Sequence, residues 1–357
     1  MTTLDDLPIR DDLRGMTPYG APQEHVRVRL NVNENTHAIP EDVATDIVTS
    51  LAQAVMGINR YPDREFTELR KALAGYLGHD LAADNIWAAN GSNEVLQQVM
   101  QAFGGPGRSV LGFPPTYSMH SIIASGTGTR WITAERGPGY ALTPQLVRDA
   151  IDREHPDIVF LCSPNNPTGT PLSLETIAAA YEATSGMVLV DEAYAEFADD
   201  ATALTLIEGR PRLIVSRTMS KAFAFAGARL GYLAADPAVT DAIRLVRLPY
   251  HLSAFTQAAA VAALAHAPEM LAMVEDIKAQ RDRMILALSE LGYEPLPSAA
   301  NFVLFGGVDD PRAVFEQLLA EDIIIRDVGI PHHLRVTAGS DAETTVFLDA
   351  LERITAR

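Results

Sequence analysis

Three short apolar runs, each followed directly by polar residues, place the strongest constraint on how this chain can fold. They are Ile158 to Cys162, Met187 to Val190 and Leu213 to Val215. Runs without alternating polar residues are typical of strands covered on both faces, as in a parallel sheet flanked by helices. The polar residues after each run then lie at the carboxyl ends of the strands, where open α/β sheets bind ligands. The sequence therefore predicts an α/β fold with a site at that edge.

The segment from Ser216 to Gly231 follows the third run and carries Lys221 close to the predicted strand end. Around this lysine, Thr218, Ser220 and Arg229 offer two hydroxyls and a guanidinium, which are donors that a phosphate group needs. The four small or apolar residues after the lysine would partly desolvate its amine, which lowers the pKa and makes the amine a nucleophile. A lysine chosen at random is usually a solvated surface charge, but these neighbours favour a functional role.

The other two runs also end in polar motifs. Ser163 to Gly169 brackets two asparagines between prolines, which predicts an irregular turn in which the Asn166 amide can donate to a phenolate oxygen. Asp191 follows the second run, and Tyr194 stands three residues later. Taken alone, this short acidic motif is more often a turn. Cys162 is interpreted as a buried small hydrophobic residue, because no histidine or second cysteine lies near it in the sequence.

A glycine turn opens a predicted helix earlier in the chain. Ile86 to Asn90 is expected to be a strand, and Gly91, Ser92 and Asn93 then begin a helix through Phe103. Free backbone N–H groups at such a helix start suit an anion, although many helices begin in this way without a ligand.

In combination, these motifs resemble the lysine segment of fold-type I, pyridoxal-phosphate-dependent aminotransferases, and most closely that of the histidinol-phosphate aminotransferases. The resemblance rests on Ser-Lys-Ala-Phe around Lys221 with Arg229 eight residues after the lysine, and it runs from about Tyr19 to the carboxyl end. It implies pyridoxal 5'-phosphate as cofactor, a large domain with a mostly parallel mixed sheet between helices, and a small α+β carboxyl-terminal domain. It also implies a homodimer with shared active sites.

The resemblance assigns roles to residues of this chain. Lys221 holds the cofactor and moves the proton in catalysis, Asp191 keeps the pyridine nitrogen protonated, and Tyr194 donates to the ring hydroxyl together with Asn166. The remaining cofactor contacts are the phosphate ligands Ser92, Asn93, Thr218, Ser220 and Arg229, the stacking Tyr117, and Tyr61 from the neighbouring subunit. From the residues alone, Tyr117 is also compatible with ordinary core packing, and Tyr61 with a plain interface tyrosine.

By resemblance, glutamate donates the amino group and imidazole acetol phosphate accepts it, which gives histidinol phosphate in histidine biosynthesis. Arg335, in a Leu-Arg-Val-Thr setting, resembles the carboxylate-binding arginine of the family, and Arg326 lies nine residues earlier. Two arginines in an acidic protein favour a local anion pocket. Tyr19 and Asn33 are further substrate-binding candidates. The family loop usually continues with Pro and Tyr-Gly; here Thr36-His37-Ala38 stands instead, which leaves the role of the loop open.

The 357 residues exceed what one compact core usually holds, so the chain is expected to divide into parts. We expect an amino-terminal arm over 1–29, a large cofactor-binding domain over 30–248 and a small domain over 249–357. The arm has too few apolar residues to form a core alone and is expected to pack on another surface, as in the family, where it crosses to the partner subunit.

The chain carries 28 basic and 46 acidic residues, a formal net charge of −18. This balance argues against nucleic acid or an anionic membrane as partner. Cys162 is the single cysteine, and the amino terminus lacks a basic region followed by an apolar stretch, so a reducing, cytoplasmic location is expected. No histidine or cysteine pair has the spacing of a metal site, and no metal is expected.

Three other functions compete with histidinol-phosphate transamination. An aromatic (phenylalanine) aminotransferase shares every cofactor residue, so the motifs do not exclude it. A lyase or decarboxylase on the same scaffold is a weaker alternative. A cofactor-sensing regulator would need a basic DNA-binding module, for which this acidic chain has no room.

Overall fold

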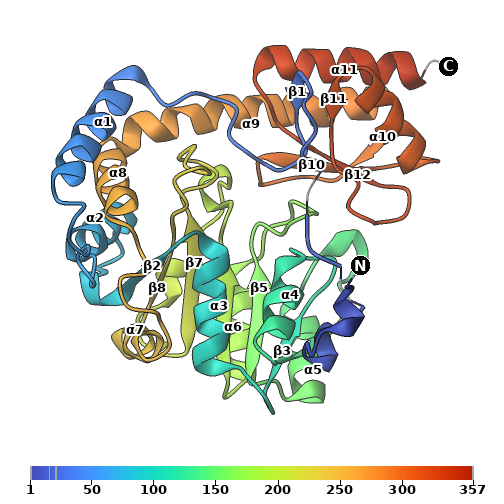
Figure 1. Cartoon of the computed structure of the whole chain (residues 1–357). Coiled ribbons are helices and arrows are strands. Elements are labelled where there is room, and N and C mark those ends of the chain that lie inside the picture. Colours follow the sequence, from blue (N-terminus) through green and yellow to red (C-terminus); the bar gives the residue numbers. More distant parts are fainter. Residues whose placement is uncertain (1, 16, 21, 356–357) are drawn as a thin grey trace.

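The computed structural model describes residues 2–15, 17–20 and 22–355, so residues 1, 16 and 21 of the predicted arm lie outside the described residues. The main sheet has the strand order β2-β8-β7-β6-β5-β3-β4 (Figure 1). In that order the strands are Ile86–Ala89, Gly231–Ala235, Leu213–Thr218, Met187–Asp191, Ile158–Cys162, Ser109–Gly112 and Arg130–Thr133. Only β8 pairs antiparallel with its neighbours, and the other pairs are parallel. This confirms the predicted mostly parallel mixed sheet.

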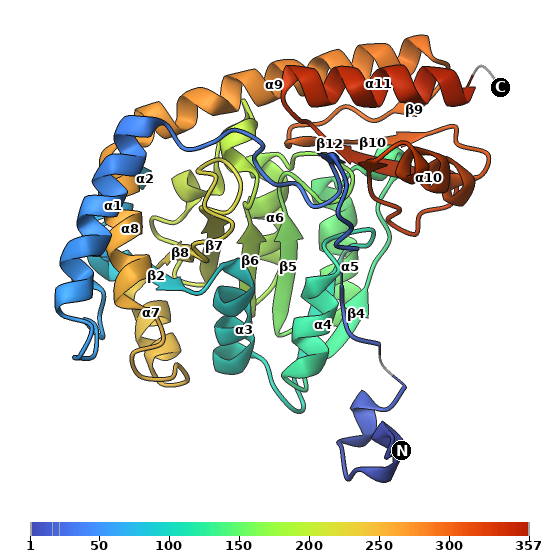
Figure 2. The same ribbon diagram turned by 45° about the horizontal axis from the view of Figure 1, so that its top comes forward.

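Helices cover both faces of this sheet (Figure 2). The helices of this part of the chain are α1 (Glu41–Met56), α2 (Thr67–Leu77), α3 (Ser92–Phe103), α4 (Met119–Gly126), α5 (Pro144–Glu154), α6 (Leu174–Ala183), α7 (Pro237–Arg244) and α8 (Ala254–Ala265), and α1 packs on α8 at the side of the sheet. Hydroxyl side chains cap several of them, because Thr143, Ser173 and Ser253 each accept a hydrogen bond from an amide of the first helical turn. Short 3₁₀ helices span Leu4–Asp6, Asp11–Leu13, Ala83–Asn85, Pro138–Tyr140, Ala195–Phe197 and Ala203–Leu206.

A second, smaller layer of structure is formed by the carboxyl-terminal part of the chain. Its three-stranded antiparallel sheet has the order β12-β10-β9, from Leu334–Thr337, Phe302–Gly306 and Glu294–Pro295. The helices α10 (Pro311–Ala320) and α11 (Asp341–Thr355) pack there, and the long α9 (Ala267–Glu290) runs to it from α8 (Figure 1). The amino-terminal β1 (Val28–Arg29) pairs in parallel with β11 (Ile323–Ile324). The amino-terminal segment therefore also contributes a strand to the carboxyl-terminal part of the structure.

No single helix among the described residues is long and apolar enough to cross a membrane. Helices α8 and α9 would meet the criteria of length and composition only as a pair bent by 78°.

The strands β5, β6 and β7 are buried along nearly their whole length, as their apolar sequences predict. Their register brings the ends of the strands together, because Cys162 pairs with Asp191 and Asp191 pairs with Ser216. The polar residues that follow the three strands therefore meet at one edge of the sheet, on the side that faces the small antiparallel sheet (Figure 1).

One charged side chain of β7 is buried. Arg217 donates to Glu192 at 2.8 Å through Nη2 and to Glu196 at 3.4 Å through Nη1, and burial raises the pKa of Glu196. Both carboxylates follow β6, so the guanidinium fixes the segment that leaves Asp191. Removing one member of this buried group would leave the charges of the other members without a counter-charge.

We predict that Arg217→Leu lowers the free energy of unfolding by about 3–5 kcal/mol at neutral pH, because two buried carboxylates lose their counter-charge. The loss should be smaller at pH 5 than at pH 8, because the pKa of Glu196 is raised in the folded protein, so this carboxyl group is more often protonated at low pH and then needs no counter-charge. Circular dichroism melting curves at both pH values measure it. The control is Arg312→Leu, whose exposed side chain pairs with Glu316 at 2.8 Å and should change stability little. Equal losses in the two variants would contradict the prediction.

Candidate functional site

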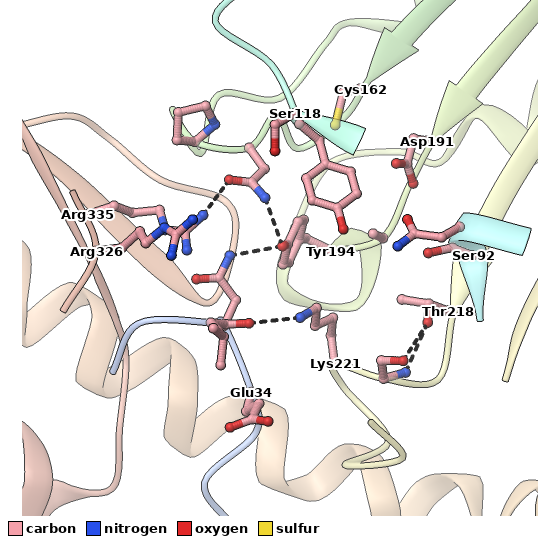
Figure 3. A pocket seen from close by; sticks show the side chains of 18 of the residues that line it. Glu34, Ser92, Ser118, Cys162, Asp191, Tyr194, Thr218, Lys221, Arg326 and Arg335 are labelled. Atoms are coloured by element: carbon pink, nitrogen blue, oxygen red, sulfur yellow. Dashed lines mark hydrogen bonds between the residues drawn. The ribbon is translucent and has the colours of Figure 1, made fainter. Parts of the chain in front are cut away.

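A cavity of about 480 Å³ opens at the carboxyl ends of β5, β6 and β7 (Figure 3). Its walls come from these strand ends, from the start of α3, from the segment 31–34 and from the loop and strand around Arg326 and Arg335. It brings together every residue that the sequence analysis assigned to cofactor or substrate except Tyr61. These residues are Tyr19, Asn33, Ser92, Asn93, Tyr117, Asn166, Asp191, Tyr194, Thr218, Ser220, Lys221, Arg229, Arg326 and Arg335.

Lys221 lies three residues beyond β7 and extends its amine across the cavity (Figure 3). Its Nζ donates to the backbone oxygen of Val32 at 3.1 Å. Burial, with the nearby positive charges of Arg335 and Arg229, lowers the pKa of this lysine to about 8, although Glu34 acts in the opposite direction. About a tenth of the amine is therefore uncharged at pH 7, far more than for an ordinary lysine, and can act as nucleophile or base.

Polar groups on one side of the lysine form a cradle of hydrogen-bond donors. The Thr218 hydroxyl donates to Ser220 Oγ at 3.0 Å and accepts from the Ser220 amide at 3.1 Å, which orders both hydroxyls. The Arg229 guanidinium lies against Gly91, whose φ is +86°. A Cβ at this glycine would come within 2.3 Å of Arg229 Nη2, so only glycine leaves room for the guanidinium.

The amino terminus of α3 completes this cradle. Ser92 and Asn93 are its first two residues, so their backbone amides have no partner within the helix. Gly231 of β8 lies directly beside them, since a Cβ there would come within 2.1 Å of the Ser92 nitrogen. The buried Asn93 Oδ1 has no hydrogen-bond partner among the residues the structure describes. The two free amides suit an anionic ligand such as a phosphate, whereas the Asn93 oxygen, an acceptor, calls for a hydrogen-bond donor.

His120 was missed by the sequence analysis. Its Nε2 lies 3.0 Å from Asp191 Oδ2, and both side chains are almost fully buried. The imidazole stacks on Phe160 with ring centroids 3.9 Å apart, and Tyr117 meets its edge at 5.4 Å. This contact holds Asp191 in one orientation at the floor of the cavity. The signal in the sequence was that His120 lies three residues after Tyr117, shortly after the end of β3.

Two arginines from the carboxyl-terminal part, Arg335 of β12 and Arg326 shortly after β11, close the opposite side of the cavity. Arg326 and Arg335 exchange two backbone hydrogen bonds of 2.9 Å, so their side chains enter the cavity together (Figure 3). Arg335 donates to Asn166 Oδ1 at 2.6 Å and to the backbone oxygen of Asn31 at 2.8 Å. Its Nε is buried without a partner among the described atoms. Burial lowers the pKa of Arg335 to about 10, which leaves it cationic at neutral pH.

Tyr61 does not line the cavity of its own chain. Its ring is 79% exposed and stacks on Tyr250 with centroids 4.4 Å apart. In the resembling family this tyrosine serves the neighbouring subunit, and an exposed position suits that role.

One group of potential metal ligands occurs in the part of the chain that the structure describes. His120, Cys162 and Asp191 offer ligand atoms within 4.8 Å of one another. The histidine and the carboxylate already bind each other, Cys162 donates to the Pro164 oxygen, and burial raises the pKa of its thiol. A protonated thiol is a poor ligand. The absence of a metal stays a prediction.

Comparisons with known proteins agree with this geometry. The family model for aminotransferase class I and II matches residues 26–351. The histidinol-phosphate aminotransferase of Paenarthrobacter aurescens (strain TC1) is 62% identical over 356 residues, which cover 98% of this chain and 96% of that protein. That of Thermobifida fusca (strain YX) is 54% identical over 357 residues, which cover 99% and 97%.

Among solved structures, histidinol-phosphate aminotransferase from Sinorhizobium meliloti in complex with pyridoxal-5'-phosphate is similar to this chain with a TM-score of 0.88. The sequence identity is 27%, and the match covers 98% of each chain. This likeness confirms the predicted fold-type I architecture.

The lowered pKa of Lys221 makes a testable prediction for the cofactor-free protein. Labelling with an amine-selective acylating reagent should reach half of its maximal rate near pH 8 at Lys221, because only the uncharged amine reacts. Peptide mapping by mass spectrometry resolves each lysine. Lys278 is the internal control, because its hydrogen bond to Asp199 at 2.6 Å raises its pKa. If Lys221 and Lys278 gained reactivity over the same pH range, the desolvation of Lys221 would be refuted.

Proposed function

We propose that this chain, which belongs to the aminotransferase class I and II family, is a pyridoxal-phosphate-dependent enzyme of histidine biosynthesis. It transfers the amino group of L-glutamate to imidazole acetol phosphate and so forms L-histidinol phosphate and 2-oxoglutarate. The observation that carries the proposal is a single cavity in which Lys221 lies between a phosphate-type cradle and two paired arginines. The relatives of similar length are named histidinol-phosphate aminotransferases, which supports histidinol phosphate as a substrate.

The residues of the cavity fit pyridoxal 5'-phosphate. The cradle of Thr218, Ser220, Arg229 and the α3 amides would hold the phosphate, and the unpartnered Asn93 Oδ1 and the space left by glycine indicate room for a polar ligand. Asp191 would face the ring nitrogen, and Asn166 and Tyr194 the ring hydroxyl. When bound, the cofactor supplies an electron sink for the electrons that remain on the substrate Cα after loss of its proton.

Lys221 performs the proton transfer in this proposal. Its Nζ would take the proton from the substrate Cα as general base and would then deliver it to the C4′ atom of the cofactor as general acid, and a pKa of about 8 suits both roles. His120 holds Asp191 so that the carboxylate keeps one orientation during the reaction. Burial raises the pKa of Tyr117 to about 12, so its phenol stays neutral beside the ring.

The two arginines explain how one pocket serves two substrates. Histidinol phosphate has a phosphate and no carboxylate, whereas glutamate has two carboxylates. A planar guanidinium pairs with either kind of oxyanion. Arg335 and Arg326 would therefore bind the phosphate in one half-reaction and a carboxylate of glutamate in the other. Tyr19 lies in the same cavity and would contribute its phenol to the substrate side.

A homodimer and a cytoplasmic location complete the proposal. Large apolar side chains are exposed on α1, on the loop that follows it and on the segment after α7, around Tyr61. These are Val48, Val55, Met56, Ile58, Leu245 and Leu248. A second copy of the chain would cover them and receive Tyr61 at its phosphate cradle. A strictly monomeric holoenzyme with full turnover in sedimentation experiments would contradict the dimer. The single cysteine suits a reducing compartment.

Substrate choice tests the proposed function. The wild type should use L-histidinol phosphate as donor to 2-oxoglutarate far better than phenylalanine or unphosphorylated histidinol. We predict that Arg335→Leu lowers kcat/KM for both histidinol phosphate and glutamate on the order of 10- to 100-fold, the loss of a charge-assisted hydrogen bond. Arg326→Leu should impair the phosphorylated substrate most.

Initial rates of each half-reaction, followed by cofactor absorbance, give these constants. Equal use of histidinol and histidinol phosphate, or a preference for phenylalanine over both, would overturn the histidinol-phosphate assignment in favour of an aromatic aminotransferase.

A further inference from the structure

Asn33 lies between the two parts of the molecule and is buried, with 1% of its surface exposed. Its amide nitrogen donates to Tyr194 Oη at 2.9 Å. On its other side it contacts the small antiparallel sheet: its backbone nitrogen donates to Thr337 Oγ1 at 3.0 Å, and its Oδ1 accepts from the same hydroxyl at 3.1 Å. Asn301 donates to its backbone oxygen at 3.1 Å. Both side-chain polar atoms of Asn33 therefore have hydrogen-bond partners within the protein.

The oxygen of Tyr194 receives a second donor. Asn166 Nδ2 donates to it at 3.3 Å, and the orientation of this amide is fixed because its oxygen accepts from Arg335. A phenol oxygen has two acceptor sites and one proton. With both acceptor sites filled by amide donors, the proton of Tyr194 is left to be donated to a third group. Burial raises the pKa of Tyr194, so the phenol keeps this proton at working pH.

We infer that Asn33 is a positioning residue that turns the hydroxyl of Tyr194 into a donor toward the ring oxygen of the cofactor. The inference rests on the proposed function, because the acceptor is the ring oxygen of pyridoxal phosphate. It assigns Asn33 a role different from the substrate contact expected from the sequence. It also joins the cofactor site to β12, because the same side chain is held by Thr337.

The test is a pH titration of visible absorbance for holoenzyme in which the cofactor is bound to Lys221. A donor to the ring oxygen stabilises its anionic form, so loss of the donor favours the protonated chromophore and raises the titration midpoint. Asn33→Gly should raise the midpoint by about one pH unit, the equivalent of one hydrogen bond. Glycine is chosen because Asn33 has φ +56°, which glycine adopts without strain.

Further variants separate positioning from a merely structural role. Asn33→Asp should also raise the midpoint, because its carboxylate would accept the Tyr194 proton. Tyr194→Phe should raise it at least as much as Asn33→Gly, and the double variant no further than Tyr194→Phe alone. Asn35→Ala is the matched control, because Asn35 donates to the Ala222 oxygen and not to Tyr194, and its midpoint should equal that of the wild type.

An unchanged midpoint in both Asn33 variants, or additive shifts in the double variant, would overturn the role of Asn33 and leave the proposed function intact. A wild-type protein that shows no visible absorbance band with pyridoxal phosphate would instead overturn the proposed function, and this inference with it.

Discussion

The parallel pairing of β5, β6 and β7 is the constraint on which the site depends. Because Cys162, Asp191 and Ser216 are paired across these strands, the segments that follow them begin side by side at one edge of the sheet. Residues far apart in the sequence, such as Asn166, Asp191 and Lys221, thereby enter one cavity. Apolar strands covered on both faces make this edge rigid. The residues that follow them are not needed for packing and can bind ligands or take part in a reaction.

Burial then sets the properties of the charged groups at this edge. Removal from water lowers the pKa of Lys221 to about 8 and that of Arg335 to about 10, which makes the amine reactive but leaves the guanidinium charged. Asp191 is buried, and its contact with His120 gives one of its carboxylate oxygens a partner. On the other face of β7, Arg217 compensates the two carboxylates that follow β6. The buried charges of the site and of the strands beneath it therefore have partners within the protein, and for Asp191 this partner comes from α4.

The sequence predicted the features that depend on a local pattern of residues. The apolar runs predicted the buried strands, and the motifs after them, together with the family resemblance, predicted which residues line the cavity. The sequence alone did not predict individual contacts between segments that lie far apart along the chain. His120 meets Asp191 across 71 residues, and Asn33 meets Tyr194 across 161, so neither spacing repeats with a helix or a strand. The first contact follows from the packing of α4 against β5 and β6, and the second from the place of Asn33 between the two parts of the molecule, neither of which periodicity encodes.

The central claim is that Lys221 is the residue to which the cofactor binds covalently. The most direct measurement is reduction of the holoenzyme with borohydride, which fixes the carbon–nitrogen bond between cofactor and lysine, followed by peptide mapping by mass spectrometry. The account predicts the added mass on Lys221 and loss of the visible absorbance band. Added mass on Lys71 or Lys278 in place of Lys221 would contradict it.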